Sequence, residues 1–70
     1  MFYFFQKEST FIRCEVRPAD DGAGFEIAIT EPNQPVRVEH YPSSDTVHRR
    51  WLELQESFQQ DGWWGPLGRD

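Results

Sequence analysis

Residues 43–62 have the sequence SSDTVHRRWLELQESFQQDG, and the spacing of their apolar residues decides the fold class. The apolar positions are spaced i, i+4, i+7 and i+11, which places them in one stripe along a helix. Ser43 or Ser44 can cap the first turn, and Gly62 suits the left-handed residue just past the last turn. This segment is therefore predicted to be an amphipathic helix whose buried stripe is Val47, Trp51, Leu54 and Phe58, with Leu52 beside it.

Three stretches before this helix alternate apolar and polar residues with the period of 2 that is typical of strands. They are Thr10–Arg17, Phe25–Glu31 and Val36–Tyr41. A fourth stretch, Phe2–Gln6, is apolar on both faces, so its aromatic residues predict a strand without orienting it. We expect the helix to cover one set of side chains, namely Ile12, Cys14, Val16, Phe25, Ile27, Ile29, Val36 and Val38; for His40, at the end of the same alternation, both orientations stay open.

The connections between these strands are short and carry turn residues. Lys7-Glu8-Ser9 is short enough for a hairpin, residues 18–24 contain Pro, Asp and Gly, and Asn33 tolerates a left-handed conformation. The sequence therefore predicts an α+β fold, a four-stranded antiparallel β-meander with one C-terminal α-helix packed on one face (ββββα, two layers). We expect a single domain over residues 1–64 and a flexible tail over residues 65–70.

Length and charge limit the functions open to the chain. A chain of 70 residues buries only about 60% of its unfolded surface, so association would add burial that the core lacks. The net charge of −5 opposes binding to nucleic-acid backbones and to anionic membranes. No apolar run approaches the roughly 20 residues that a membrane helix needs. The unpaired Cys14 fits a reducing compartment, so we expect a cytoplasmic protein.

Residues that could carry chemistry have simpler structural interpretations. Cys14 belongs to the core-facing set of its strand, where a thiol is inert. His40, Asp45 and His48 lie near one another in sequence but have no recognised metal-ligand spacing. The acidic residues on the outer sheet face alternate with arginines, which predicts cross-strand ion pairs. We therefore predict no catalytic residues, no metal and no cofactor.

The strongest functional signal is the set of aromatic and arginine side chains on the face that a single helix leaves uncovered. Interfaces are enriched in such residues. The first strand contributes either Phe2 and Phe4 or Tyr3 and Phe5, and Trp63-Trp64 is a candidate anchor beyond the helix. We expect a non-enzymatic interaction domain that forms a homodimer through the open sheet face or an edge strand, with an unidentified protein partner as an alternative. The candidate interface residues are Tyr3, Phe5, Phe11, Arg13, Arg37, Tyr41 and Trp64.

A second hypothesis is a module that binds single-stranded nucleic acid. The expected ββββα order resembles the repeat of the Whirly and PUR-type single-stranded DNA-binding proteins, which use the sheet as a binding surface; the resemblance is one of topology and involves no motif residues. Phe11 and Tyr41 could stack on bases while Arg13, Arg17 and Arg37 meet phosphates. The acidic net charge opposes this hypothesis.

Overall fold

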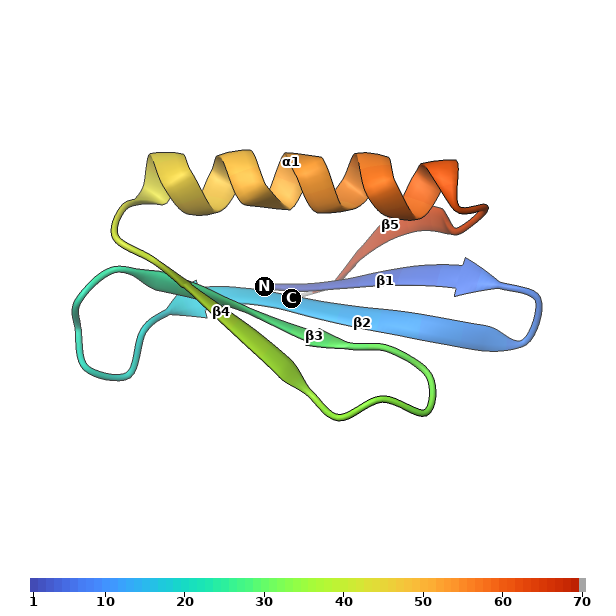
Figure 1. Ribbon diagram of the computed structural model, residues 1–70, viewed down its shortest axis with the longest axis horizontal. Helices are drawn as coiled ribbons and strands as arrows, with labels where there is room; N and C mark the ends of the chain where they lie inside the picture. Colours follow the sequence, from blue (N-terminus) through green and yellow to red (C-terminus); the bar gives the residue numbers. More distant parts are fainter. Residues whose placement is uncertain (70) are drawn as a thin grey trace.

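The computed structural model describes residues 1–69 and has one helix lying across one face of a five-stranded sheet (Figure 1). The elements are β1 (Phe2–Lys7), β2 (Thr10–Pro18), β3 (Phe25–Thr30), β4 (Arg37–Tyr41), α1 (Ser44–Gln60) and β5 (Trp64–Arg69). The strands lie in the order β4-β3-β2-β1-β5, and every neighbouring pair is antiparallel. The predicted two-layer α+β class is confirmed, and the number of strands is corrected from four to five.

The predicted turns form in the meander of β1 to β4. Glu8 and Ser9 alone connect β1 to β2, and Glu8 has a positive φ of 56°. Asn33 has a φ of 61° in the turn between β3 and β4, as expected for a residue that tolerates the left-handed region. These tight connections keep neighbouring strands paired in sequence order.

Helix α1 begins and ends where the sequence predicts. The hydroxyl of Ser43 accepts a hydrogen bond of 3.2 Å from the backbone N–H of Thr46, and the Thr46 hydroxyl accepts one of 3.2 Å from the backbone N–H of Ser43. Gly62 has a φ of 93° after the last turn, and the N–H of Trp63 donates to the carbonyl of Phe58 at 2.9 Å. Both ends thus satisfy backbone groups that a helix terminus leaves unpaired.

The core lies between α1 and the sheet. The buried residues of α1 are the four predicted stripe residues, and they cover the buried residues of β1, β2 and β3. Trp51 is central, because its ring lies 4.6 Å from that of Tyr3 and 5.9 Å from that of Phe5. The Phe5 ring in turn lies 5.0 Å from that of Phe58. Aromatic packing therefore fills the thin core of this short chain. The sheet residues in the core are Phe5, Ile12, Cys14, Ile27 and Ile29.

The C-terminal segment differs from the prediction. It pairs with β1 as strand β5, so the expected flexible tail over residues 65–70 is wrong for residues 65–69; residue 70 lies outside the described residues. The side-chain amide of Gln59 donates to the carbonyl of Gly65 at 2.9 Å and holds the start of β5 at the end of α1. A Cβ at Gly65 would lie 2.7 Å from the carbonyl oxygen of Phe4. Gly65, which lies in the segment that was expected to be a tail, therefore permits the close approach of β5 to β1.

Strand β4 faces the opposite way from the prediction. Val36 and Val38 are 58% and 38% exposed, so their expected place under the helix is wrong, and His40, whose orientation the sequence left open, is exposed as well. Strand β4 is one of the two edge strands of the sheet. On its helix side, Glu39 forms an ion pair with the charged Arg50 of α1. Alternation defines the two faces of a strand but does not say which one is covered. The residues of β4 on the helix side are Arg37, Glu39 and Tyr41.

Candidate functional site

We call the side of the sheet turned away from α1 the open face. The register of each strand pair determines which side chains lie on it, because alternate residues point to opposite faces. Strand β2 lies at the middle of the sheet and contributes an unbroken row of four residues. Those on β1, β2 and β5 are Phe2, Phe4, Gln6, Phe11, Arg13, Glu15, Arg17, Trp64 and Leu67. Those on β3 and β4 are Glu26, Ala28, Thr30, Val38 and His40.

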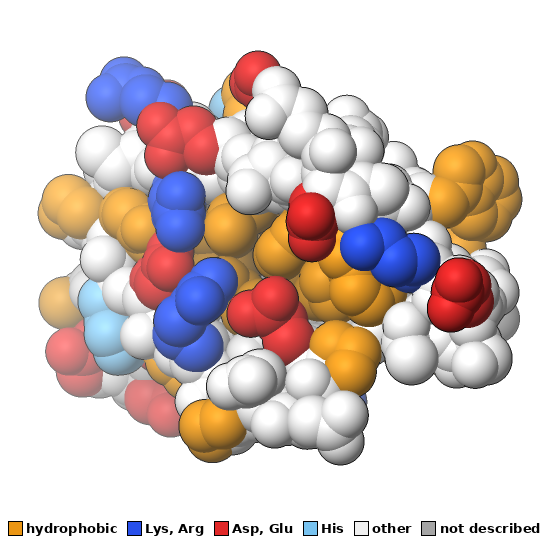
Figure 2. Space-filling model, turned by 45° about the vertical axis from the view of Figure 1, so that its right-hand side comes forward, with side chains coloured by type: hydrophobic (Ala, Val, Ile, Leu, Met, Phe, Trp, Pro, Cys, Tyr) orange, Lys and Arg blue, Asp and Glu red, His pale blue; other side chains and the backbone are white. Residues whose placement is uncertain are grey.

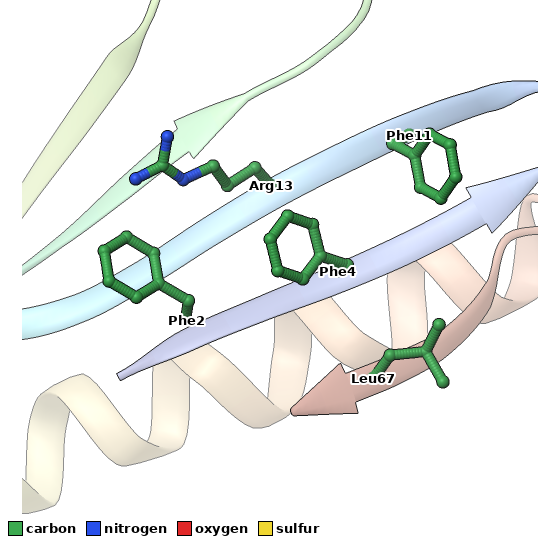
Figure 3. A pocket seen from close by; sticks show the side chains of 5 residues that line it. All are labelled: Phe2, Phe4, Phe11, Arg13 and Leu67. Carbon is green, nitrogen blue, oxygen red and sulfur yellow. The ribbon is translucent and has the colours of Figure 1, made fainter. Parts of the chain in front are cut away.

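Apolar side chains of three strands gather on the β1 and β5 side of the open face. They line a shallow hollow of about 970 Å3, which we call the apolar hollow. Figure 3 shows these side chains on β1, β2 and β5, with the helix behind the sheet. Phe11 is 52% exposed and Leu67 is 37% exposed, so the hollow leaves large apolar groups in contact with water. Such a gathering is typical of an interaction surface. The lining residues are Phe2, Phe4, Phe11, Arg13 and Leu67.

Arg13 is the one charged residue of this hollow. Its guanidinium carbon lies 4.5 Å from the centroid of the Phe2 ring, which is a cation–π contact. None of the ion pairs among the described side chains includes Arg13. Its positive charge is therefore neutralised by no carboxylate of residues 1–69.

From β2 toward the β3 and β4 side, the open face carries paired charges. Arg17 on β2 lies directly opposite Glu26 on β3 and donates to its carboxylate, while its Nη1 donates to Glu15 at 2.8 Å. The His40 Nδ1 lies 3.4 Å from the second oxygen of Glu26. Glu26 is only 4% exposed, so these partners replace the water that a carboxylate would otherwise bind. The predicted ion pairing across β2 and β3 is confirmed.

The seven candidate interface residues divide between the two faces. Phe11, Arg13 and Trp64 lie on the open face, and Trp64 is 66% exposed. The other four lie on the helix side, which corrects the expectation that they belong to the open face: Tyr3, Phe5, Arg37 and Tyr41.

The orientation of β1 explains the first part of this correction. Phe5 lies opposite the buried Ile12, and Tyr3 lies opposite the buried Cys14, so both point toward Trp51 of α1. Phe2 and Phe4, the other alternative that the sequence allowed, occupy the open face instead. Trp63 packs against the core from beyond the helix. Leu67 was missed because its segment was expected to be a tail.

The charged residues of β4 form a network with α1. The Arg50 side chain donates two hydrogen bonds to the Glu39 carboxylate, at 2.8 and 3.2 Å, and the Tyr41 hydroxyl donates a third at 2.7 Å. These bonds, those from Arg50 first, hold the pKa of Glu39 below its usual value. Burial and the hydrogen bond to Glu39 raise the pKa of Tyr41.

Acidic and basic side chains also alternate on the surface seen in Figure 2, with hydrophobic side chains between them.

The groups considered for chemistry occupy structural positions. Cys14 is buried, and this burial raises the pKa of its thiol to about 12, so little of the reactive thiolate forms near neutral pH. Within residues 1–69, no three His, Cys, Asp or Glu side chains are grouped so that they could hold a metal ion. No helix in this part of the chain is long and apolar enough to cross a membrane.

Comparison with known proteins finds no family model, no curated protein and no solved structure that matches the chain. The fifth strand is also a departure from the ββββα order of the Whirly and PUR-type repeats, since β5 follows the helix and extends the sheet beyond β1.

Proposed function

We propose that this chain is a non-enzymatic interaction domain that forms a homodimer through the open face of its sheet. The apolar hollow is the observation that carries this proposal. Its phenylalanine and leucine side chains are held on three paired strands, and α1 covers only the other side of the sheet. Apolar burial contributes about 25 cal/mol per Å2, so covering this hollow would stabilise a chain with a small core of its own.

The charges on the open face favour a second copy of the chain as the partner. Arg13 and Arg17 contribute positive charge, and Glu15 and Glu26 contribute negative charge on the same surface. A surface with both signs can match itself in a two-fold contact, because the axis can place the positive groups of each copy against the negative groups of the other. A partner whose contact surface carries charges of one sign would meet like charges at two of these four residues.

The edges of the sheet are weaker candidates for self-association than its face. Strand β4 ends the sheet on one side and carries charged side chains, including Arg37 and Glu39. Strand β5 ends it on the other side and contains Pro66, which has no N–H to donate to an added strand. Charged residues and proline are both features that discourage pairing between edge strands.

Sedimentation equilibrium at micromolar concentrations tests the proposal with two matched variants. Phe11→Glu places a charge in the apolar hollow and should raise the dissociation constant by about 10-fold or more. Leu52→Glu is the control, because Leu52 is 50% exposed, close to the 52% of Phe11, but lies on α1. We expect the control to dimerise like the wild type. A wild-type chain that stays monomeric throughout this range would overturn the proposal.

A second candidate function, binding of single-stranded nucleic acid, is favoured by one observation. The rings of Phe2, Phe4 and Phe11 lie beside an arginine that has no carboxylate partner among residues 1–69, and exposed rings can stack on bases. The charge of −5 and the glutamates of the open face oppose it. Titration with a single-stranded oligonucleotide at increasing salt separates the two functions, since nucleic-acid binding should weaken steeply with salt.

A further inference from the structure

Four residues of β1 and β2 form a square on the open face. Phe4 lies opposite Arg13 in one row, and Phe2 lies opposite Glu15 in the next row. Residues two apart on a strand are about 7 Å apart, so the two rows are neighbours. Each row therefore holds one phenyl ring and one charged group, and the charges of the two rows are opposite.

Both charged groups of this square have capacity for another partner. Arg13 takes part in none of the ion pairs among the described side chains, and its side chain is exposed. Glu15 accepts a hydrogen bond from Arg17 through Oε1, whereas no described side chain donates to its Oε2. Arg13 and Glu15 both border a second hollow of about 160 Å3, which is roomy because the neighbouring β3 residues, Ala28 and Thr30, are small.

We infer that two copies stack their open faces with their β2 strands antiparallel, so that Arg13 of each copy pairs with Glu15 of the other. This inference rests on the proposed function, since it specifies the register of that homodimer. A two-fold axis that lies between the rows, perpendicular to the strands, exchanges one row with the other. It places Arg13 over Glu15 of the second copy and Phe4 over Phe2 of the second copy. Sheets that stack face to face lie about 10 Å apart, a distance that extended Arg and Glu side chains span together.

Other registers of the same stacking match the charges less well. An axis through the row of Phe4 and Arg13 would bring the two Arg13 guanidinium groups face to face. An axis parallel to the strands, between β1 and β2, would press the Glu15 carboxylate against the Phe2 ring of the second copy, where the negative face of the ring repels it. Of these three registers, only the antiparallel one with its axis between the rows pairs Arg13 and Glu15 with each other.

Charge reversal tests this register, because the two single variants should complement each other. In the Arg13→Glu homodimer, both contacts become Glu against Glu, and in the Glu15→Arg homodimer both become Arg against Arg. Each variant alone should therefore dissociate at a concentration about 10-fold or more above that of the wild type. An equimolar mixture of the two variants forms heterodimers in which both contacts join opposite charges. We expect this mixture to regain the wild-type dissociation constant to within a few-fold, roughly 3-fold.

Mixtures of each variant with the wild type provide the matched control, because they restore only one of the two contacts and should be intermediate. Glu15→Arg also removes the ion pair with Arg17. If that variant unfolds, the variants Arg13→Gln and Glu15→Gln test the register instead. In sedimentation equilibrium, the double Gln variant should then be no weaker a dimer than either single variant. A wild-type dimer whose reversed variants fail to complement, or whose Gln effects are additive, overturns the register alone. A wild-type monomer overturns the proposed function as well.

Discussion

The guanidinium of Arg50 on α1 holds the carboxylate of Glu39 on β4 with two hydrogen bonds, 2.8 Å from Nε to Oε1 and 3.2 Å from Nη2 to Oε2. Two parallel bonds of this kind fix the relative orientation of their partners. Because Glu39 must point toward α1 to make them, Val38 and His40 point to the open face. The ion pair between Arg50 and Glu39 thus accompanies an orientation of β4 that is opposite to the one predicted from the sequence.

Replacing Arg50 should destabilise the fold by removing both hydrogen bonds to Glu39. The Glu39 side chain is 20% exposed, so we expect Arg50→Gln to cost about 1–2 kcal/mol, between exposed ion pairs and hydrogen bonds to charged groups. Urea denaturation at about pH 7 measures this. Arg49→Gln is the control, because Arg49 is exposed on the same helix and takes part in none of the described ion pairs. Equal effects of the two variants would contradict a role for the Glu39 contact.

The same contact predicts how stability changes with pH. The pKa of Glu39 is lower in the folded chain than its usual value of 4.5, chiefly because Arg50 bonds to its ionised form. Its contribution is therefore fully present above about pH 4.5 and is lost as the pH falls through the folded-state pKa. Urea denaturation from about pH 7 to pH 3 should show a smaller acid-induced loss of stability in Arg50→Gln than in the wild type. Parallel pH profiles would contradict this linkage.

Trp51 anchors the helix to the sheet through two aromatic contacts. Trp51→Ala removes the ring that packs against Tyr3 and Phe5, and truncation of a buried aromatic residue costs about 3–5 kcal/mol. A domain of this size has little more stability than that to lose, so much of the population should unfold. Leu52→Ala, at the next and exposed position, should change the midpoint of thermal unfolding by little. An unchanged melting temperature for Trp51→Ala would contradict its place in the core.

The helix and the central strands were predictable because local signals determine them. The spacing from Val47 to Phe58 matches the buried stripe, and Ser43 and Gly62 mark the helix ends, since caps act within one turn. The glycines of β5 had no such local interpretation. The sequence of residues 65–70 predicts a loose tail, and only the approach of the Phe4 backbone reveals why a residue without a side chain belongs at position 65.

The sequence places some of the candidate site residues on the correct face of the sheet and others on the wrong one, because it does not determine the orientation of every strand. Phe11 and Arg13 were located correctly, because the alternation of β2 has one clearly apolar side. Strand β1 is apolar on both sides, so the choice between Phe4 and Phe5 depends on the register with β2. Leu67 could be assigned to the open face only once β5 was known to pair with β1.

The thiol of Cys14 should be inert in the folded protein. Its side chain is fully buried, and burial raises its pKa to about 12, so both access and thiolate formation are suppressed. A thiol-specific reagent at about pH 8 should modify the unfolded chain in urea rapidly and the folded chain only through unfolding. Equal reaction rates in the presence and absence of urea would contradict the position of Cys14 between the sheet and α1.

The pairing of β5 with β1 can be tested by substituting the two glycines of β5, Gly65 and Gly68. A Cβ at Gly65 would lie 2.7 Å from the Phe4 carbonyl oxygen and 3.0 Å from Cδ1 of Phe5, and the φ of Gly65 is 150°, a conformation that side chains rarely adopt. Gly65→Ala should therefore destabilise the fold by about 1–3 kcal/mol in urea denaturation. Gly68→Ala is the control in the same strand, because its Cβ would meet no atom within 4 Å. Since β5 carries Leu67 into the apolar hollow, Gly65→Ala should also weaken the proposed homodimer, and equal effects of the two alanines on stability would contradict the pairing of β5 with β1.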